Sequence, residues 1–366
     1  MKNVIVGIGG AGINLLDEWI LAEEPTGLFY ALDCDYPSVE GSLADYRILL
    51  GKEKAKGAGS HGDIDFAKLI LEDEEQLIDQ ILDHCDHLLV LCGLGGGMGS
   101  AGLSFFSEKA KQKELIMSCI GFLPFSSESF LQLEITRKTL EYLSDYNHRF
   151  ILFPNDRAQN VFGPEDDRNR LYRNFNKKVG IVVSCWYDLV QEKINEPFDQ
   201  LGFPEVFLIE EFYTFPIQTD DPFSLIQPFI QPVQDSIPDQ KSAWVCLFLS
   251  SSLRKLDKTD IKIKGKNFFK QFYVTVVQGE EGTKEMGFIA MGKFKFEGYF
   301  KTEKSKKLEN AENKEKEKDQ DLKPAKELIK DENVPMGIFE KSNKTIHKGI
   351  NLDLPTFIRK GISIKI

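Results

Sequence analysis

Two glycine-rich loops constrain the fold of this 366-residue chain more than any other feature. The first, Gly7–Gly12, overlaps the end of the apolar run Asn3–Ile8, and the second, Gly93–Gly102, follows the apolar run His87–Cys92. Each loop opens a segment that we expect to be helical. Glycines at such a point let backbone N–H groups approach a phosphate at a helix N-terminus. Two such loops at one edge of a sheet are suited to holding a chain of phosphates from both sides.

The first half of the chain alternates between apolar runs and segments with helical spacing of apolar residues. Fully apolar strands that alternate with helices predict an α/β fold, with a Rossmann-like parallel sheet covered on both faces. The right-handed crossover rule places the loops after the strands at one edge. The predicted strands are 3–8, 28–32, 87–92, 115–123 and 150–153, and the predicted helices are 13–24, 65–83, 128–144 and 168–194.

Prolines become frequent after residue 195, where three further strand-like runs follow at 244–249, 272–278 and 286–296. The glycine-containing segment between the last two runs predicts a hairpin. We therefore expect a nucleotide-binding domain with a long central helix at 1–195 and a smaller α+β domain at 196–300. A charged disordered linker at 301–333 and a basic tail at 334–366 complete the predicted organisation.

Charge is distributed unevenly along the chain. The sequence has 46 Lys plus Arg against 57 Asp plus Glu, for a net charge of −11. Residues 301–332 hold ten Lys and ten acidic residues, whereas 333–366 carry a net +4, so 1–300 carry −15. An acidic body argues against a dedicated binder of duplex DNA or other nucleic acid. The linker has too little apolar surface to offset the entropy of ordering.

No apolar run approaches the roughly 20 residues that cross a bilayer, so we expect no transmembrane segment. The N-terminal residues lack the basic head and long apolar stretch of a signal peptide. The six cysteines lie far apart in the sequence, mostly inside apolar runs, which favours reduced thiols. We therefore expect a cytoplasmic protein, which reaches a membrane only through a partner.

The first loop also satisfies the dinucleotide fingerprint G-x-G-x-x-G, with Asp33 at the end of the following strand. An NAD-dependent oxidoreductase is therefore an alternative function. The five His residues show no paired spacing typical of a catalytic site or of a metal site. The second glycine loop argues against NAD, because a dinucleotide needs only one.

The second loop resembles the signature loop GGGTGTG of the tubulin/FtsZ family, with Met98 and Ser100 in the threonine positions. Other matching segments are collinear over residues 3–157 and resemble FtsZ more than tubulin. They are Gly9–Asn14 for the first loop, Leu32–Asp35 for the second-strand N-T-D, Gly57–Gly59 for the third loop, Pro124–Glu128 for the ribose loop and Phe153–Arg157 for I-P-N-D-[KR]. The segment 352–360 also resembles the terminal D-I-P-[AT]-F-[LI]-R peptide of FtsZ.

This resemblance implies that the protein binds GTP or GDP, with Mg²⁺ carried by the nucleotide. It assigns ribose contact to Glu128, base contact to Asn14 and Asn155, and base stacking to Tyr172. Asn176 falls near the position of the guanine-recognising aspartate, where it could accept one hydrogen bond. The remaining nucleotide-binding residues implied by the resemblance are Gly9, Gly10, Ala11, Gly95, Gly96, Gly97, Met98, Gly99 and Ser100.

Three departures from the family pattern weaken what the resemblance implies. Gln132 replaces an arginine, and Asn176 or Lys177 replaces the guanine-recognising aspartate, so guanine specificity is less secure than nucleotide binding. In FtsZ a loop N-L-D-F-A-D of one subunit polarises water at the nucleotide of the next. Its counterpart here is Gln200–Glu205, in which Gly202 replaces the first acid. The catalytic candidates are therefore Glu205 and the upstream Asp199, and we expect slow or absent hydrolysis.

The resemblance further implies head-to-tail filaments, in or near cell division. The alternative to a filament-forming protein is an interaction protein, a non-polymerising regulator or scaffold of a true FtsZ. The terminal segment 351–366 is predicted to dock on a membrane anchor or division partner. Its docking residues are Leu354, Pro355, Phe357, Ile358, Arg359 and Lys360.

Overall fold

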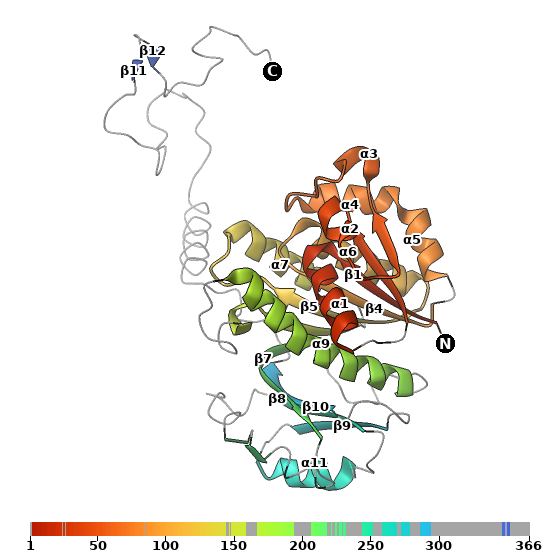
Figure 1. The fold of residues 1–366 in the computed structure, drawn as a ribbon, viewed down its shortest axis with the longest axis vertical. Helices are drawn as coiled ribbons and strands as arrows, with labels where there is room; N and C mark the ends of the chain where they lie inside the picture. Colours follow the sequence, from red (N-terminus) through yellow and green to blue (C-terminus); the bar gives the residue numbers. More distant parts are fainter. Residues whose placement is uncertain are drawn as a thin grey trace, which may run out of the picture. The chain divides into compact units, whose positions relative to one another are not determined.

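A sheet of ten strands organises the computed structural model, in the order β3-β2-β1-β4-β5-β6-β7-β10-β8-β9 (Figure 1). The structure describes residues 2–158 except a few single positions, 167–193, 206–217, 244–251, 258–268, 272–278, 286–293 and short pieces near 221–231 and 346–351. The strands are β1 (Asn3–Ile8), β2 (Leu28–Asp33), β3 (Tyr46–Leu49), β4 (His87–Gly93), β5 (Ile116–Leu123), β6 (Arg149–Pro154), β7 (Val206–Pro216), β8 (Trp244–Ser251), β9 (Phe272–Gln278) and β10 (Met286–Lys293).

Seven of these strands, from β3 to β7 along the sheet, are parallel to one another. This confirms the predicted Rossmann-like α/β fold, and it places the loops after β1, β2, β4, β5 and β6 at one edge. β10 is antiparallel to both β7 and β8, and β9 pairs in parallel with β8. The predicted hairpin between the strands at 272–278 and 286–296 is therefore wrong, because β8 lies between β9 and β10.

Helices cover both faces of the parallel sheet. They are α1 (Gly9–Glu23), α2 (Tyr36–Glu40), α3 (Lys52–Ala55), α4 (Ile64–Asp73), α5 (Glu75–Leu82), α6 (Gly97–Gln112), α7 (Phe130–Leu143), α9 (Arg168–Lys193) and α11 (Lys258–Lys266). On one face of the sheet, β1 side chains such as Ile5 pack in a core with α1 and α9. On the other face, β1 side chains such as Val4 and Val6 pack in a second core with the helices α4, α5, α6 and α7. Successive residues of a strand thus enter opposite cores, which explains why these strands are continuously apolar.

The long helix α9 is held against α1 by Trp19, which is fully buried. The indole Nε1 of Trp19 donates a hydrogen bond to the Ser184 Oγ at 2.7 Å. Its ring contacts Phe29 and Tyr187 edge-on, at centroid distances of 5.9 and 5.5 Å. These contacts hold the C-terminal half of α1 against the central helix α9.

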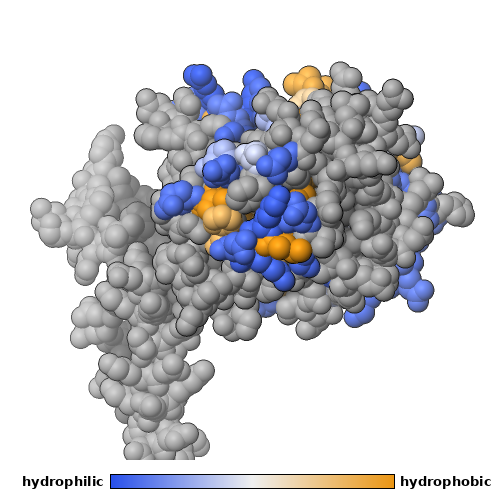
Figure 2. Space-filling view, turned by 90° about the horizontal axis from the view of Figure 1, so that it is seen from below, coloured by the Kyte–Doolittle hydropathy of each residue, from blue (hydrophilic) through white to orange (hydrophobic). Residues whose placement is uncertain are grey.

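Helix α11 has a mixed basic and apolar surface. Figure 1 shows α11 and α3 at opposite ends of the body formed by residues 1–305. Figure 2 views the molecule from below and shows apolar residues bordered by hydrophilic ones on that face. Ile261 is buried against the sheet, whereas Ile263 is 62% exposed and Phe268 36% exposed. The stretch 254–270 contains seven Lys or Arg and two Asp, so it is strongly basic within an acidic body.

Residues 306–366 form a second unit, in which β11 (Ile346–His347) pairs with β12 (Ile350–Asn351). The predicted disordered linker, the docking peptide beyond Asn351 and the catalytic candidates Asp199 and Glu205 lie outside the described residues. The predicted boundary at 195/196 remains a prediction, since one sheet continues from β6 through β7 to β10. Among the described helices, none is both long and apolar enough to span a membrane.

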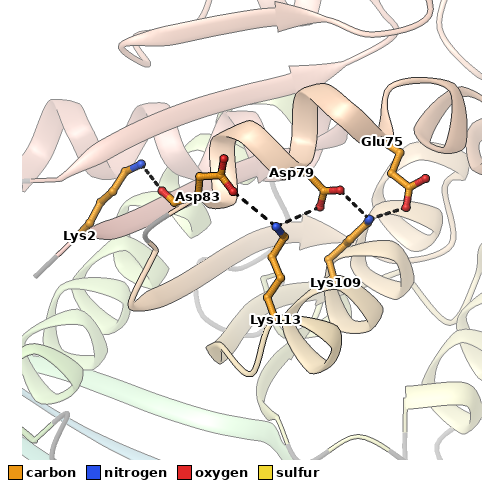
Figure 3. Close-up of polar contacts among 6 residues, drawn as sticks. All are labelled: Lys2, Glu75, Asp79, Asp83, Lys109 and Lys113. Atoms are coloured by element: carbon orange, nitrogen blue, oxygen red, sulfur yellow. Dashed lines mark hydrogen bonds and ion pairs between the residues drawn. The ribbon is translucent and has the colours of Figure 1, made fainter.

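A ladder of ion pairs joins α5 to α6 (Figure 3). Lys109 Nζ contacts Glu75 Oε1 at 2.5 Å and Asp79 Oδ2 at 3.2 Å, although its side chain is only 6% exposed. Lys113 approaches Asp79 at 3.5 Å and Asp83 at 3.6 Å from a more exposed position. Burial lowers the pKa of Lys109, but its hydrogen bonds to the two carboxylates outweigh burial and raise the pKa overall.

We expect Lys109→Met to lower the free energy of unfolding by about 1–2 kcal/mol, because it removes a cation that is desolvated and doubly paired. Lys113→Met is the matched control, because the ion pairs of Lys113 are longer and more exposed to solvent. We expect it to lower the free energy of unfolding by less than about 0.5 kcal/mol. Urea denaturation of both variants measures the difference. Equal effects of the two substitutions would contradict this account of the ladder.

Candidate functional site

A cavity of about 380 Å³ lies at the carboxyl edge of the parallel strands. Loops after β1, β2, β4, β5 and β6 contribute to its lining, as the fold class predicts for a ligand site. The predicted nucleotide-binding residues that line it are Gly9, Gly10, Ala11, Gly96, Gly97, Met98, Gly99, Glu128 and Asn155. Segments separated by more than 140 residues in the sequence are thus brought together at one site.

The two glycine loops touch each other at the base of this cavity. Gly9 has a left-handed φ of +72°, and a Cβ on it would lie 3.0 Å from the backbone N of Gly99. A Cβ on Gly12 would lie 2.1 Å from the carbonyl oxygen of Leu91, so only glycine lets α1 pack this closely on β4. Similarly, a Cβ on Gly99 would lie 2.1 Å from the Gly93 oxygen. The loops are glycine-rich for packing and for access to the backbone alike.

The start of α6 offers unpaired backbone donors to the cavity. Its N-cap, Gly96, makes no side-chain capping hydrogen bond. The first N–H groups of a helix have no intrahelical partner, and the helix dipole favours an anion there. Gly95 has a φ of +89°, and its N–H donates to the buried Ser100 Oγ at 3.0 Å. Ser100 and Gly95 therefore brace the loop and do not line the cavity themselves.

Polar side chains from the loops after β5 and β6 form the opposite wall. Glu128 Oε1 accepts from the backbone N–H of Phe125 at 3.1 Å, which leaves its second carboxylate oxygen for a ligand hydroxyl. The Asp156 carboxylate accepts from the N–H and Oγ of Ser126 at 2.9 and 3.0 Å. These bonds tie the loop that carries Glu128 to the loop that carries Asn155.

Sequence reasoning did not include two carboxylates of this cavity, Asp33 and Asp35, among the site residues. Asp33 is 5% exposed, and its burial raises its pKa to about 6. The N–H groups of Cys34 and Asp35 donate hydrogen bonds to its carboxylate, which lower the pKa but do not outweigh burial. Asp35 caps α2 by accepting from the N–H and Oγ of Ser38. Both lie in the matched segment Leu32–Asp35, so the signal was present.

The third glycine loop closes the cavity beside these carboxylates. Tyr36 N–H donates to the Gly57 oxygen at 2.9 Å, and Gly59 N–H donates to the Cys34 oxygen at 3.1 Å. The residues that follow this loop and also line the cavity are Ser60, His61 and Gly62, which sequence reasoning missed. Their position directly after a matched loop was the available signal.

Three predicted base-contacting residues do not line the cavity. Asn14 is exposed on α1, and Asn176 is 7% exposed on α9. Tyr172 is half-buried, and its ring lies 6.0 Å from that of Phe125, in the loop that also carries Glu128. Their proposed contacts with a base remain predictions. Within the described part of the chain, the cavity lining contains no Lys or Arg, and no group of three His, Cys, Asp or Glu is placed to hold a metal ion.

Comparisons with known proteins point to one superfamily. The sequence profile of the Tubulin/FtsZ family, GTPase domain, matches residues 2–163. Cell division protein FtsZ 1 of Thermococcus kodakarensis is 28% identical over 160 residues, which are 44% of this chain and 43% of the relative. FtsZ of Methanothermobacter thermautotrophicus is 29% identical over 189 residues, 52% of this chain and 49% of the relative. The matches thus span less than half of these relatives' length.

Solved structures share the fold at lower sequence identity. CetZ2 from Haloferax volcanii, solved as a GTPγS-bound protofilament, superposes with a TM-score of 0.65 at 16% identity, covering 85% of this chain and all of that one. An empty FtsZ dimer from M. jannaschii gives a TM-score of 0.60 at 18% identity, covering 80% of this chain and 88% of that one. The match to the Tubulin/FtsZ family, GTPase domain, thus covers residues 2–163, and the structural similarities show that the chain shares the fold of these CetZ and FtsZ proteins.

Proposed function

We propose that the cavity binds GTP or GDP. The observation that carries the proposal is the contact between Gly9 and Gly99, which brings the starts of α1 and α6 to one cavity. Backbone N–H groups at both helix starts would hold the phosphates from two sides. Glu128 would accept from a ribose hydroxyl, and Asn155 and Tyr172 would contact the base.

Magnesium would be needed to hold a triphosphate in this cavity. The lining includes the carboxylates of Asp33, Asp35 and Glu128, without a cationic side chain among the described residues. A cation carried by the nucleotide would reduce the repulsion between the phosphates and these carboxylates. EDTA is therefore expected to weaken nucleotide binding strongly.

We expect Asp33→Asn to strengthen GTP binding about tenfold at pH 7.5 when Mg²⁺ is absent, because one charge facing the phosphates is removed. The wild-type Asp33 carboxyl, with a pKa of about 6, becomes neutral on acidification. The advantage of the variant should therefore shrink at pH 5. Titration of a fluorescent GTP analogue at both pH values measures this, and protonation of the nucleotide affects both proteins alike. A constant ratio of affinities would contradict the assignment.

The same carboxyl has a consequence for stability. Its folded-state pKa of about 6 exceeds its ordinary value of 3.8, so the folded protein binds more protons between these pH values. The contribution of Asp33 to stability is thus greatest below pH 4 and is lost as the pH rises through 6. In Asp33→Asn this part of the pH dependence should disappear.

Head-to-tail self-association is the second part of the proposal. α11, at the end of the body remote from α3, is basic and presents the exposed Ile263, whereas the cavity is acidic. Stacking copies in one direction would bring opposite charges together and cover this apolar side chain. The alternative, a non-polymerising regulator or scaffold of a true FtsZ, would bind nucleotide but would not pellet on its own with GTP.

Pelleting and phosphate release with GTP test the polymer and its turnover together. We expect GTP-dependent pelleting with slow release, because Gly202 stands where the family has an acid. Lys262→Glu with Lys266→Glu should abolish pelleting and leave nucleotide binding unchanged. Rapid phosphate release without assembly would refute the proposal. Identifying the co-purified nucleotide separates GTP or GDP from NAD, which the oxidoreductase alternative requires.

A role in or near cell division, in the cytoplasm, completes the proposal. The terminal segment would connect the polymer to a membrane anchor or division partner through its apolar and basic residues. Deleting 351–366 is expected to abolish partner binding and to leave GTP binding intact. Partner binding that survives the deletion would refute this part.

A further inference from the structure

A second and larger cavity, of about 1020 Å³, lies between α4 and α7 and over α6. Its floor includes Ala101 and Phe105 of α6 and Ile135 of α7, and the 66% exposed Leu131 stands on its rim. We call this cavity the α4–α7 groove. It shares His61, Gly62 and Gly96 with the nucleotide cavity but otherwise belongs to different residues. The proposed nucleotide function makes no use of it.

Thr139 indicates that the groove is built to receive a polar ligand group. It lines the groove and is only 4% exposed, yet its Oγ1 has no hydrogen-bond partner among the described residues. A buried hydroxyl without a partner costs about 1–3 kcal/mol. A ligand that lies in the groove and bonds to this hydroxyl would recover that cost.

The charged side chains of the groove favour a cationic ligand. Its lining carries five acids against two lysines, Lys68 and Lys138. The acids are Asp63, Asp65, Glu72, Glu108 and Glu134. Glu134 is paired with Arg137 on its own helix, whereas Glu72 is exposed on the α4 rim. Apolar floor, unpartnered hydroxyl and acidic rim together suit a peptide that combines apolar anchors with basic residues.

The chain itself carries a peptide of this chemistry. Residues 351–366 read NLDLPTFIRKGISIKI, in which Phe357 and Ile358 are followed at once by Arg359 and Lys360. The 32-residue segment 301–332 lies between this peptide and the acidic body, and a flexible chain of that length spans about 30 Å. We propose that the α4–α7 groove binds the terminal segment 351–366 of a second copy of this protein.

Binding of this segment would have two consequences. Copies would be linked sideways by their tails, independently of head-to-tail stacking. The groove would also compete with any other partner for the same terminal peptide. Since the groove adjoins the phosphate loop at Gly96, an occupied groove lies next to the nucleotide.

The test uses a fluorescein-labelled synthetic peptide of residues 351–366 and fluorescence anisotropy, without nucleotide, so that it does not depend on GTP binding or assembly. The receptor is the full chain with Phe357→Ser and Arg359→Glu in its own tail, so that this tail does not compete. We expect the peptide to bind saturably. Its affinity should be at least tenfold lower for the double variant Glu72→Lys with Leu131→Ser. Glu53→Lys, an exposed acid on α3 outside the groove, is the matched control and should leave binding unchanged.

Thr139→Val separates binding from folding. The substitution keeps the shape of the side chain and removes the unpartnered hydroxyl, so stability should not fall, whereas peptide affinity should decrease severalfold. Absence of saturable binding would overturn the proposal, as would equal binding by the groove variants and the control. A scrambled peptide that binds as well as the native one would likewise overturn it, because attraction of charge alone would then suffice.

Discussion

Gly99→Ala is expected to abolish nucleotide binding and to lower the free energy of unfolding by about 3 kcal/mol or more. The added Cβ would lie 2.1 Å from the carbonyl oxygen of Gly93 and 3.1 Å from its carbonyl carbon. Gly93 is the last residue of β4 and is paired in register with Phe122 of β5, so its backbone cannot retreat without breaking the sheet edge. The start of α6 must move instead, and it would move away from the first glycine loop.

Gly96→Ala is the matched control for this prediction. A Cβ on Gly96 would meet nothing within 4 Å, and its φ of −90° is ordinary for alanine. We therefore expect a change in unfolding free energy within about 0.5 kcal/mol. Urea denaturation of both variants, followed by titration with a fluorescent GTP analogue, makes the comparison. If Gly99→Ala is as stable as Gly96→Ala, the close packing of the second loop described above is incorrect.

Local pattern was sufficient to predict the parallel half of the fold because each strand there is buried on both faces. β1 has the predicted bounds, since every residue from Asn3 to Ile8 is buried. The predicted helix 65–83 is instead two helices, α4 and α5. The break falls at Glu74, whose Oε1 accepts from the backbone N–H of Gly51 at 3.1 Å. A contact over 23 residues is invisible to helical periodicity.

The order of the strands in the sheet explains why the predicted hairpin between β9 and β10 was wrong. A glycine-containing turn between two strand-like runs predicts a hairpin, but the strand that comes between β9 and β10 in the sheet, β8, precedes both in the sequence. The candidate site was predictable where backbone conformation needs glycine, as at Gly9 and Gly99. The raised pKa of Asp33 was not predictable, because the burial that causes it depends on the loops packed around this residue.

Gly202→Asp combined with Glu205→Asp is expected to raise the rate of GTP hydrolysis at least tenfold. In the family, the carboxylates of this loop position and polarise water at the nucleotide of the adjoining subunit. Gly202 supplies no acceptor for that water, and Glu205 places its carboxylate one methylene farther out than the family residue. Because in-line attack on phosphate depends on placement to within about an ångström, restoring both acids should restore much of the rate.

The matched variant for this experiment is Gly202→Asn with Glu205→Asp, which adds a side chain of the same size without its charge. It should hydrolyse GTP at close to the wild-type rate, because an amide cannot act as a carboxylate toward water. Phosphate release should be followed at several protein concentrations. If one copy completes the site of the next, the rate per molecule rises with concentration as filaments form, and disassembly then follows hydrolysis. Equal rates in the two double variants would show that this loop does not reach the nucleotide, and would remove the reason for expecting weak turnover in the wild-type protein.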